Sequence, residues 1–286
     1  MPTVPLVDAH MHLWDTSAHA WYPSLARFVD AGKPEIAQNF LPADFDRGLG
    51  DIRVDGLVHV SATTAPHAYL AETRWADGIA DADPRPFALV GGIDPTLPKD
   101  ELIDHLDQQA RTPRLRGIRA FAGLSPNTPA ADTIAGWLQE HDAVFDLVAQ
   151  PDEILDWIDF LAGYPDLRVV LEHLGFPQGR SSEARTAWHN AISLAAKETQ
   201  WLCKLSGFGL ICRDLSWPTV EYWLESSVAL WGWRRLMFAS NMPVDSMAGT
   251  YTELVTTIDQ AVTTDATEQE AEYFYRTNAL DTYRPQ

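Results

Sequence analysis

Eight short apolar segments, separated by longer stretches of helical periodicity, constrain the fold of this 286-residue chain more than any other feature. Each segment is rich in Val, Leu and Ile and nearly free of polar interruptions, as expected of parallel strands covered on both faces. The stretches between them place apolar residues three and four positions apart, which is typical of amphipathic helices. The strand segments lie at 6–12, 54–63, 87–94, 115–122, 144–149, 168–175, 201–207 and 235–241.

This alternation predicts an α/β protein with a (β/α)8 TIM barrel that forms one domain over residues 1–286. The alternative is a doubly wound nucleotide-binding sheet, but no GxGxxG or GxxxxGKS turn occurs in the sequence. Residues 13–53 are long for a strand-to-helix connection, so we expect an extended loop with a short helix over one barrel mouth. The stretch 267–284 predicts a terminal helix packed on the outside of the barrel.

Charge and composition limit the partners of the protein. The chain has 40 acidic and 21 basic residues and a net charge of −19, which repels nucleic acids and anionic membranes. We find no signal peptide and no apolar run long enough to span a bilayer. Two cysteines without a disulfide or metal-binding pattern indicate a reducing cytoplasm. We therefore expect a small-molecule substrate, and a homodimer is kept as an alternative to a monomer.

Three histidines stand at the predicted ends of strands, which is where barrels of this kind carry their active sites. His10 and His12 end the first strand, and residues two positions apart on a strand share a face. His173 ends the sixth strand. Imidazoles grouped in this way suit a divalent transition metal such as zinc or manganese, and the alternative is a set of core histidines.

Several motifs resemble the amidohydrolase superfamily, and in particular its branch of 2-pyrone-4,6-dicarboxylate and sugar-acid lactonases. The motifs are VDAHMHLWD, LEHLGFP, CKLSG, RLMFASNMPVD and NALDTYR. The resemblance implies a TIM barrel in which His10, His12 and His173 match histidines that bind a divalent ion in many members. It also implies that Arg119 meets a substrate carboxylate or carbonyl, the alternative being a stabilising ion pair. The pyrone lactonase branch works without a metal, so the resemblance leaves metal-independent catalysis open.

The eighth strand departs from this family pattern. Members usually carry an Asp that activates the hydrolytic water, whereas this chain has Asn241, whose amide cannot act as a general base. One interpretation is that Asp245, four residues later, supplies the base. A second is that the reaction needs no strong base, because a metal ion or a good leaving group lowers the barrier. A third is that hydrolysis has been lost.

Four further residues are candidates for roles at the site. His59 shares a face with Leu57 on the second strand, so it could act as an acid or base at the mouth or simply pack. Lys204 on the seventh strand could stabilise negative charge in the substrate or lie in a buried ion pair. Trp14 and Tyr22 in the long loop could wall the substrate pocket or hold the loop in place.

Two acidic residues beside the histidines are expected to play structural parts. Asp8 shares the face of His10 and His12 but lies deeper, so we expect it to orient a histidine. Glu172 precedes His173 and is therefore expected to face the helices.

These observations predict a hydrolase that opens a lactone or a related cyclic ester. A non-oxidative decarboxylase of aromatic acids is the first alternative, although Asn241 argues against it as well. A cyclase, an isomerase or a barrel that only binds a small molecule is the second.

Overall fold

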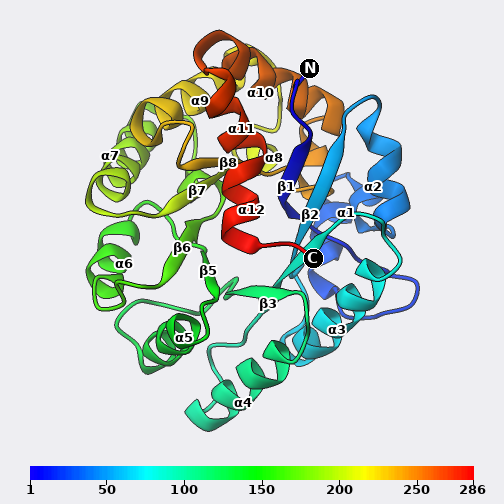
Figure 1. Ribbon diagram of the computed structural model, residues 1–286, viewed down its shortest axis with the longest axis vertical. Helices are drawn as coiled ribbons and strands as arrows, with labels where there is room; N and C mark the ends of the chain where they lie inside the picture. The colour runs from blue at the N-terminus through cyan, green and yellow to red at the C-terminus, as the bar shows by residue number, and fades with distance from the viewer.

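Eight parallel strands in sequential order form the centre of the molecule in the computed structural model, which describes residues 1–286 (Figure 1). The strands are β1 Leu6–Met11, β2 Val54–Val60, β3 Phe87–Gly92, β4 Leu115–Arg119, β5 Val144–Leu147, β6 Arg168–Leu171, β7 Leu202–Leu205 and β8 Leu236–Phe238. Just beyond β8, the amide of Asn241 donates to the carbonyl of His10, and the amide of His12 donates to that of Met242. These bonds join the first and last strands, and the predicted TIM barrel is confirmed.

Helices surround the barrel and follow the strands in turn (Figure 1). They are α1 Ala26–Asp30, α2 Pro42–Leu49, α3 Tyr69–Ala80, α4 Lys99–Ala110, α5 Pro129–Glu140, α6 Ile154–Leu161, α7 Ser182–Glu198, α8 Phe208–Ile211, α9 Trp217–Trp231, α10 Tyr251–Asp265, α11 Glu268–Glu272 and α12 Asn278–Tyr283. Caps fix several of their starts. At α10, Thr250 accepts a hydrogen bond from the amide of Glu253, whose carboxylate accepts one from the amide of Thr250. None of the helices is both long and apolar enough to cross a bilayer.

Two layers of apolar side chains pack on the two faces of the sheet. Large side chains fill the space between the strands and the outer helices, while smaller Val and Ala side chains fill the barrel itself. Val58 and Val60 of β2 and Val170 of β6 belong to the inner group. The inner group therefore shows, strand by strand, which residues point into the barrel.

The C-terminal helix occupies a different place from the one predicted. Instead of packing only on the outside, α12 lies across the amino-terminal end of the barrel, and Ala279 and Tyr283 join the inner apolar group (Figure 1). The Tyr283 hydroxyl donates to the buried carboxylate of Asp146 on β5. An amphipathic sequence indicates that one helix face is buried, but it does not indicate against which part of the barrel.

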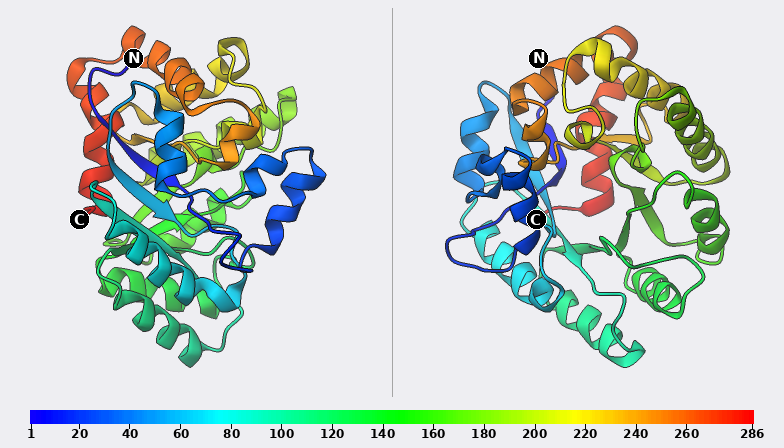
Figure 2. Two further views of the ribbon diagram at one scale, coloured as in Figure 1. Left: turned by 90° about the vertical axis from the view of Figure 1, so that its right-hand side faces the viewer. Right: turned by 180° about the vertical axis from the view of Figure 1, so that it is seen from behind.

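The long segment after β1 covers the opposite end, as predicted. It carries α1 and α2, and Figure 2 shows α1 on the side of the barrel away from α12. Trp14, Tyr22, Leu25, Phe28 and Ile36 of this segment form a small buried cluster of their own. The cluster holds the segment over the carboxyl ends of the strands.

Candidate active site

A bulge in β1 brings His10 and His12 into the barrel. Between Asp8 and Met11, β1 has one residue more than the paired part of β2, so the alternation of faces breaks there. His10 and His12 both point inward, with their Nε2 atoms 3.3 Å apart. Asp8 lies instead beside Tyr251 of α10 and accepts hydrogen bonds from the amides of Ser240 and His10. The expectation that Asp8 shares the histidine face is therefore wrong, although it does support the backbone of His10.

Asn241 connects His12 to Asp245. The Nδ1 atom of His12 lies 2.8 Å from the carbonyl oxygen of Val60, which can only accept, so Nδ1 carries the proton and Nε2 has a free lone pair. Asn241 donates from Nδ2 to Oδ1 of Asp245 over 2.9 Å, which turns its own Oδ1 toward Nε2 of His12 at 3.1 Å. Two acceptors thus face each other with no hydrogen between them. A cation bound there would remove this conflict.

Asp245 is completely buried and does not line the cavity. Burial raises the pKa of its carboxyl to about 7, although the Asn241 amide and the backbone at 207–209 oppose the rise. The chain packs tightly around it, since a Cβ at Gly209 would lie 2.9 Å from its Oδ1. Asp245 therefore reaches the site through Asn241 and not directly.

Lys204 lies beneath His10 in an ion pair. Its Nζ atom is 2.5 Å from Oδ2 of Asp146 and 3.3 Å from Nδ1 of His10, and its side chain is fully buried. The Tyr283 hydroxyl binds the other oxygen of Asp146. This is the buried ion pair that the sequence left open as an alternative to substrate binding, and Lys204 does not line the cavity.

His173, Glu172 and Arg119 form the other side of the site. His173 has a positive φ of 49°, which ends the strand alternation, and its Nδ1 lies 2.7 Å from the Ser206 hydroxyl. Glu172 points inward like Val170, two positions before it, and its Oε2 accepts from Arg119 Nη1 at 3.1 Å. The expectation that Glu172 faces the helices is therefore wrong, because its alternation runs from Val170 and not from His173.

The site keeps its histidines neutral. Burial lowers the pKa values of His10, His12 and His173 well below the usual range, and the nearby cations Lys204 and Arg119 lower them further. Neutral imidazoles have the lone pairs that a metal ion requires.

The spacing of these groups fits one divalent ion. Ligand atoms about 2.1 Å from a shared ion lie roughly 3.0–3.4 Å apart. Nε2 of His12 lies 3.3 Å from Nε2 of His10 and 3.1 Å from Oδ1 of Asn241, both within this range. Atoms of His10, Glu172 and His173 also lie within 4.8 Å of one another. Oε1 of Glu172 has no hydrogen-bond partner, although it lies 3.5 Å from Nδ1 of His10. The residues therefore offer a suitable donor set.

A cavity of about 330 Å³ opens above this group. His12, His173, Asn241 and Arg119 lie in its wall, together with residues from the loops that follow several strands. Those loop residues are Arg27, Phe28, Ala31, Thr63, Phe121, Phe176, Leu210, Arg213, Val244 and Met247. The strand-end residues thus meet a space large enough for a small molecule.

Besides His10, Asp245 and Lys204, three more predicted site residues lie outside this cavity wall. His59 is on the face of β2 opposite to Val58 and Val60, and its Nδ1 accepts a hydrogen bond from the amide of Leu13, so its contacts are those of a packing residue. Trp14 donates to the carbonyl of Gln38 and lies behind His12, while Tyr22 is buried in the loop cluster. Both aromatic side chains hold the loop, which was the other role considered for them.

Sequence reasoning missed two arginines in the wall, Arg27 on α1 and Arg213 just after α8, as well as the inward Asp146. Asp146 could have been found, because it follows Val144 by two positions on a predicted strand. Arg27 and Arg213 carry no such signal, since neither a five-residue helix nor a loop has a periodicity that indicates where its side chains point.

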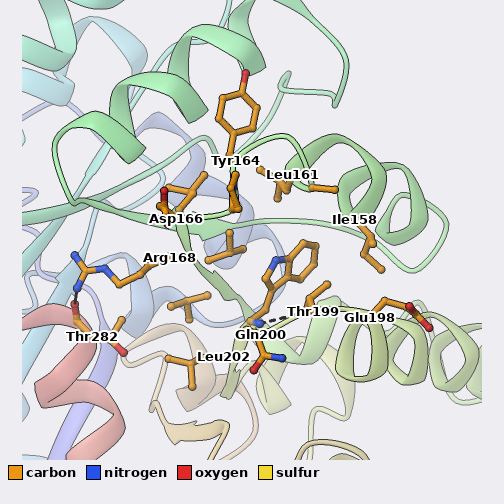
Figure 3. A pocket seen from close by; sticks show the side chains of 16 residues that line it. Ile158, Leu161, Tyr164, Asp166, Arg168, Glu198, Thr199, Gln200, Leu202 and Thr282 are labelled. Atoms are coloured by element: carbon orange, nitrogen blue, oxygen red, sulfur yellow. Dashed lines mark hydrogen bonds between the residues drawn. The ribbon is translucent and has the colours of Figure 1, made fainter.

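A second cavity, of about 370 Å³, lies at the amino-terminal ends of β6 and β7 (Figure 3). Arg168, Leu202 and Thr282 are among its lining residues, and no histidine is among them. Active sites of TIM barrels lie at the carboxyl ends of the strands, so the cavity above the histidines is the candidate active site.

The histidines and arginines of this (β/α)8 barrel gather where TIM-barrel enzymes carry their active sites. The sequence matches the amidohydrolase family over residues 7–284, and the chain therefore belongs to that family. This confirms the resemblance seen in the motifs.

Individual relatives cover most of the chain. L-fucono-1,5-lactonase of Burkholderia ambifaria is 28% identical over 253 residues, which are 85% of this chain and 82% of the relative. The uncharacterized protein y4mH of Sinorhizobium fredii is 26% identical over 307 residues, which cover 99% of this chain and 100% of the relative. A solved amidohydrolase from Burkholderia multivorans with bound zinc has a TM-score of 0.84 at 22% identity, covering 99% of this chain and 100% of that one.

Proposed function

We propose that the protein hydrolyses a lactone or a related small cyclic ester in the cavity above His12, His173 and Asn241. The observation that carries this proposal is the convergence of imidazoles and the Asn241 carbonyl oxygen on one point of the cavity floor. The similarity to L-fucono-1,5-lactonase supports a lactone over other esters and amides.

His10, His12, His173 and Asn241 would hold a divalent ion, zinc or manganese, with Glu172 beside them. Such an ion polarises a carbonyl group and lowers the pKa of a water molecule. Without an ion, the protons of these histidines can instead be held by hydrogen bonds within the protein. In that state Nδ1 of His10 accepts from Lys204, and Nε2 of His10 donates to His12. To hold an ion through Nε2, His10 would carry its proton on Nδ1, which lies 3.5 Å from Oε1 of Glu172.

The remaining side chains position the reactants. Arg119 lies in the cavity wall, held by Glu172 and by the carbonyl of Ser61, and it can donate to an oxygen of the substrate. Asn241, held by Asp245, presents a fixed acceptor that orients the attacking water. No carboxylate lines the cavity, so in the state without an ion His12 and His173 are the basic groups that can take the proton of this water.

The test is a lactone panel followed by pH-stat titration. The protein is assayed as purified, after treatment with a chelator, and after reloading with zinc or manganese. We expect turnover of at least one lactone, and its loss in His12→Gln but not in the control His189→Gln, which changes an exposed histidine of α7. Absence of turnover in every form would contradict the proposal. Carbon dioxide release from aromatic acids, measured alongside, would favour a decarboxylase instead.

A further inference from the structure

We infer that the substrate is anionic, and that Arg27 and Arg213 bind a carboxylate that the lactone carries outside its ring. This inference rests on the proposed function and names its substrate class. It begins with the charge of the cavity wall, which contains three arginines and no aspartate or glutamate. Such a wall is unexpected on a chain that has 40 acidic and only 21 basic residues.

The three arginines differ in how their charge is balanced. Arg119 is buried and paired with Glu172, so its charge is neutralised within the protein. Arg27 and Arg213 form neither an ion pair nor a side-chain hydrogen bond, and the Arg27 guanidinium lies 4.8 Å from the ring centroid of Phe28. Two uncompensated positive charges therefore face the cavity.

The two arginines come from separate parts of the chain. Arg27 lies on α1 in the segment after β1, and Arg213 lies just after α8, which follows β7. Both are exposed, whereas the histidines on the floor are buried. A lactone whose ring carbonyl meets the floor would therefore direct an exocyclic carboxylate toward these two guanidinium groups.

Apolar side chains surround the arginines and favour a bound ligand. Phe28 and Phe176 line the wall, and Phe121 and Leu210 are exposed by 36% and 41%. Phe121 and Leu210 are two of only five large apolar side chains exposed on the whole protein. A ligand that covers them removes water from the guanidinium groups, which strengthens their attraction for a carboxylate.

The experiment compares two lactones of equal ring size that differ in one group. D-glucaro-1,4-lactone carries a carboxylate where D-glucono-1,4-lactone carries a hydroxymethyl group. Rates are measured for the parent, for Arg27→Gln and Arg213→Gln, and for Arg111→Gln, an exposed arginine at the end of α4 that lines no described cavity. The parent should prefer the carboxylated lactone. Each cavity variant should lose roughly 10- to 100-fold in kcat/KM for it, as expected for one charge-assisted hydrogen bond.

The neutral lactone and the Arg111→Gln control should change by less than about twofold, and added salt should weaken only the reaction of the carboxylated lactone. Equal rates for the two lactones, or equal losses in all three variants, would overturn the inference while leaving lactone hydrolysis intact.

Binding separates failure of this inference from failure of the proposed function. The ring-opened acids, glucarate and gluconate, are titrated into the protein by calorimetry, which requires no turnover. Preferential glucarate binding that weakens in Arg27→Gln and Arg213→Gln would support the anion site even if no lactone is hydrolysed. Equal binding of glucarate and gluconate would refute the anion site.

Discussion

Replacing Asn241 with aspartate would put two carboxylates side by side in a fully buried position. The amide nitrogen that would become an oxygen lies 2.9 Å from Oδ1 of Asp245. Two full charges at that distance repel by about 6 kcal/mol at an effective dielectric constant of about 20. Keeping one carboxyl protonated at pH 7, about three pH units above the Asp pKa in an unfolded chain, costs about 4 kcal/mol. Protonation is the smaller cost, so the pair would share a proton.

We therefore expect Asn241→Asp to be up to about 4 kcal/mol less stable than the parent at pH 7. A carboxyl whose pKa is raised in the folded state stabilises the protein below the unfolded pKa and loses this contribution as the pH rises. The difference in unfolding free energy between the variant and the parent should accordingly shrink toward pH 4. The double variant Asn241→Asp with Asp245→Asn keeps one hydrogen bond and one carboxylate, so its stability should lie within about 1 kcal/mol of the parent.

The assays are urea unfolding at pH 4.5 and 7.5 and the pH profile of lactone hydrolysis. At pH 7.5 the double variant presents an ionised carboxylate to the cavity, and turnover should rise by roughly 100-fold or more, as for an added general base. The single variant should show this gain only at higher pH. Equal stability of the single variant, the double variant and the parent at pH 7.5 would refute the reasoning.

Three further outcomes are expected. Tyr283→Phe should cost about 1 to 3 kcal/mol in urea unfolding, because it leaves a buried oxygen of Asp146 without its donor; an unchanged midpoint would contradict this. Burial raises the pKa of Glu72 to about 7, so its contribution to stability declines as the pH rises from 4.5 to 7. Glu72→Gln should therefore reduce the slope of the unfolding free energy against pH by up to about 1.4 kcal/mol per pH unit. Equal slopes for the parent and the variant would argue against this role of Glu72. Zinc or manganese at 100 times its Kd should raise the unfolding free energy of the parent by about 2.7 kcal/mol, but not that of His12→Gln. Equal increases in the two proteins would exclude His12 as a ligand.

Most of the barrel could be predicted from the sequence, because strands buried on both faces appear as uninterrupted apolar runs. The long segment over the mouth was also readable from its length. The position of α12 could not be predicted, since its apolar face could pack equally well on the side of the barrel or across its end.

The site was predictable only as far as regular alternation extends. The spacing of His10 and His12 survives the bulge in β1, but the same bulge turns Asp8 outward. Positive φ angles at His173 and Asn241 redirect both side chains, and no glycine marks either place. Glu172 was consequently placed on the wrong face. Steric and hydrogen-bonding conditions set by the folded surroundings determine these angles, so local sequence does not reveal them.

The position of α12 across the barrel makes assembly of the site depend on a segment that is synthesised after all eight strands. Asp146 and Lys204 leave the ribosome well before Tyr283, the residue that completes their hydrogen bonding beneath His10. Gln286, which follows α12, then pairs with Phe87 at the start of β3. A nascent chain that has already made all eight strands would thus still lack the lower support of its histidines. The histidines would gain this support only when α12 docks across the barrel.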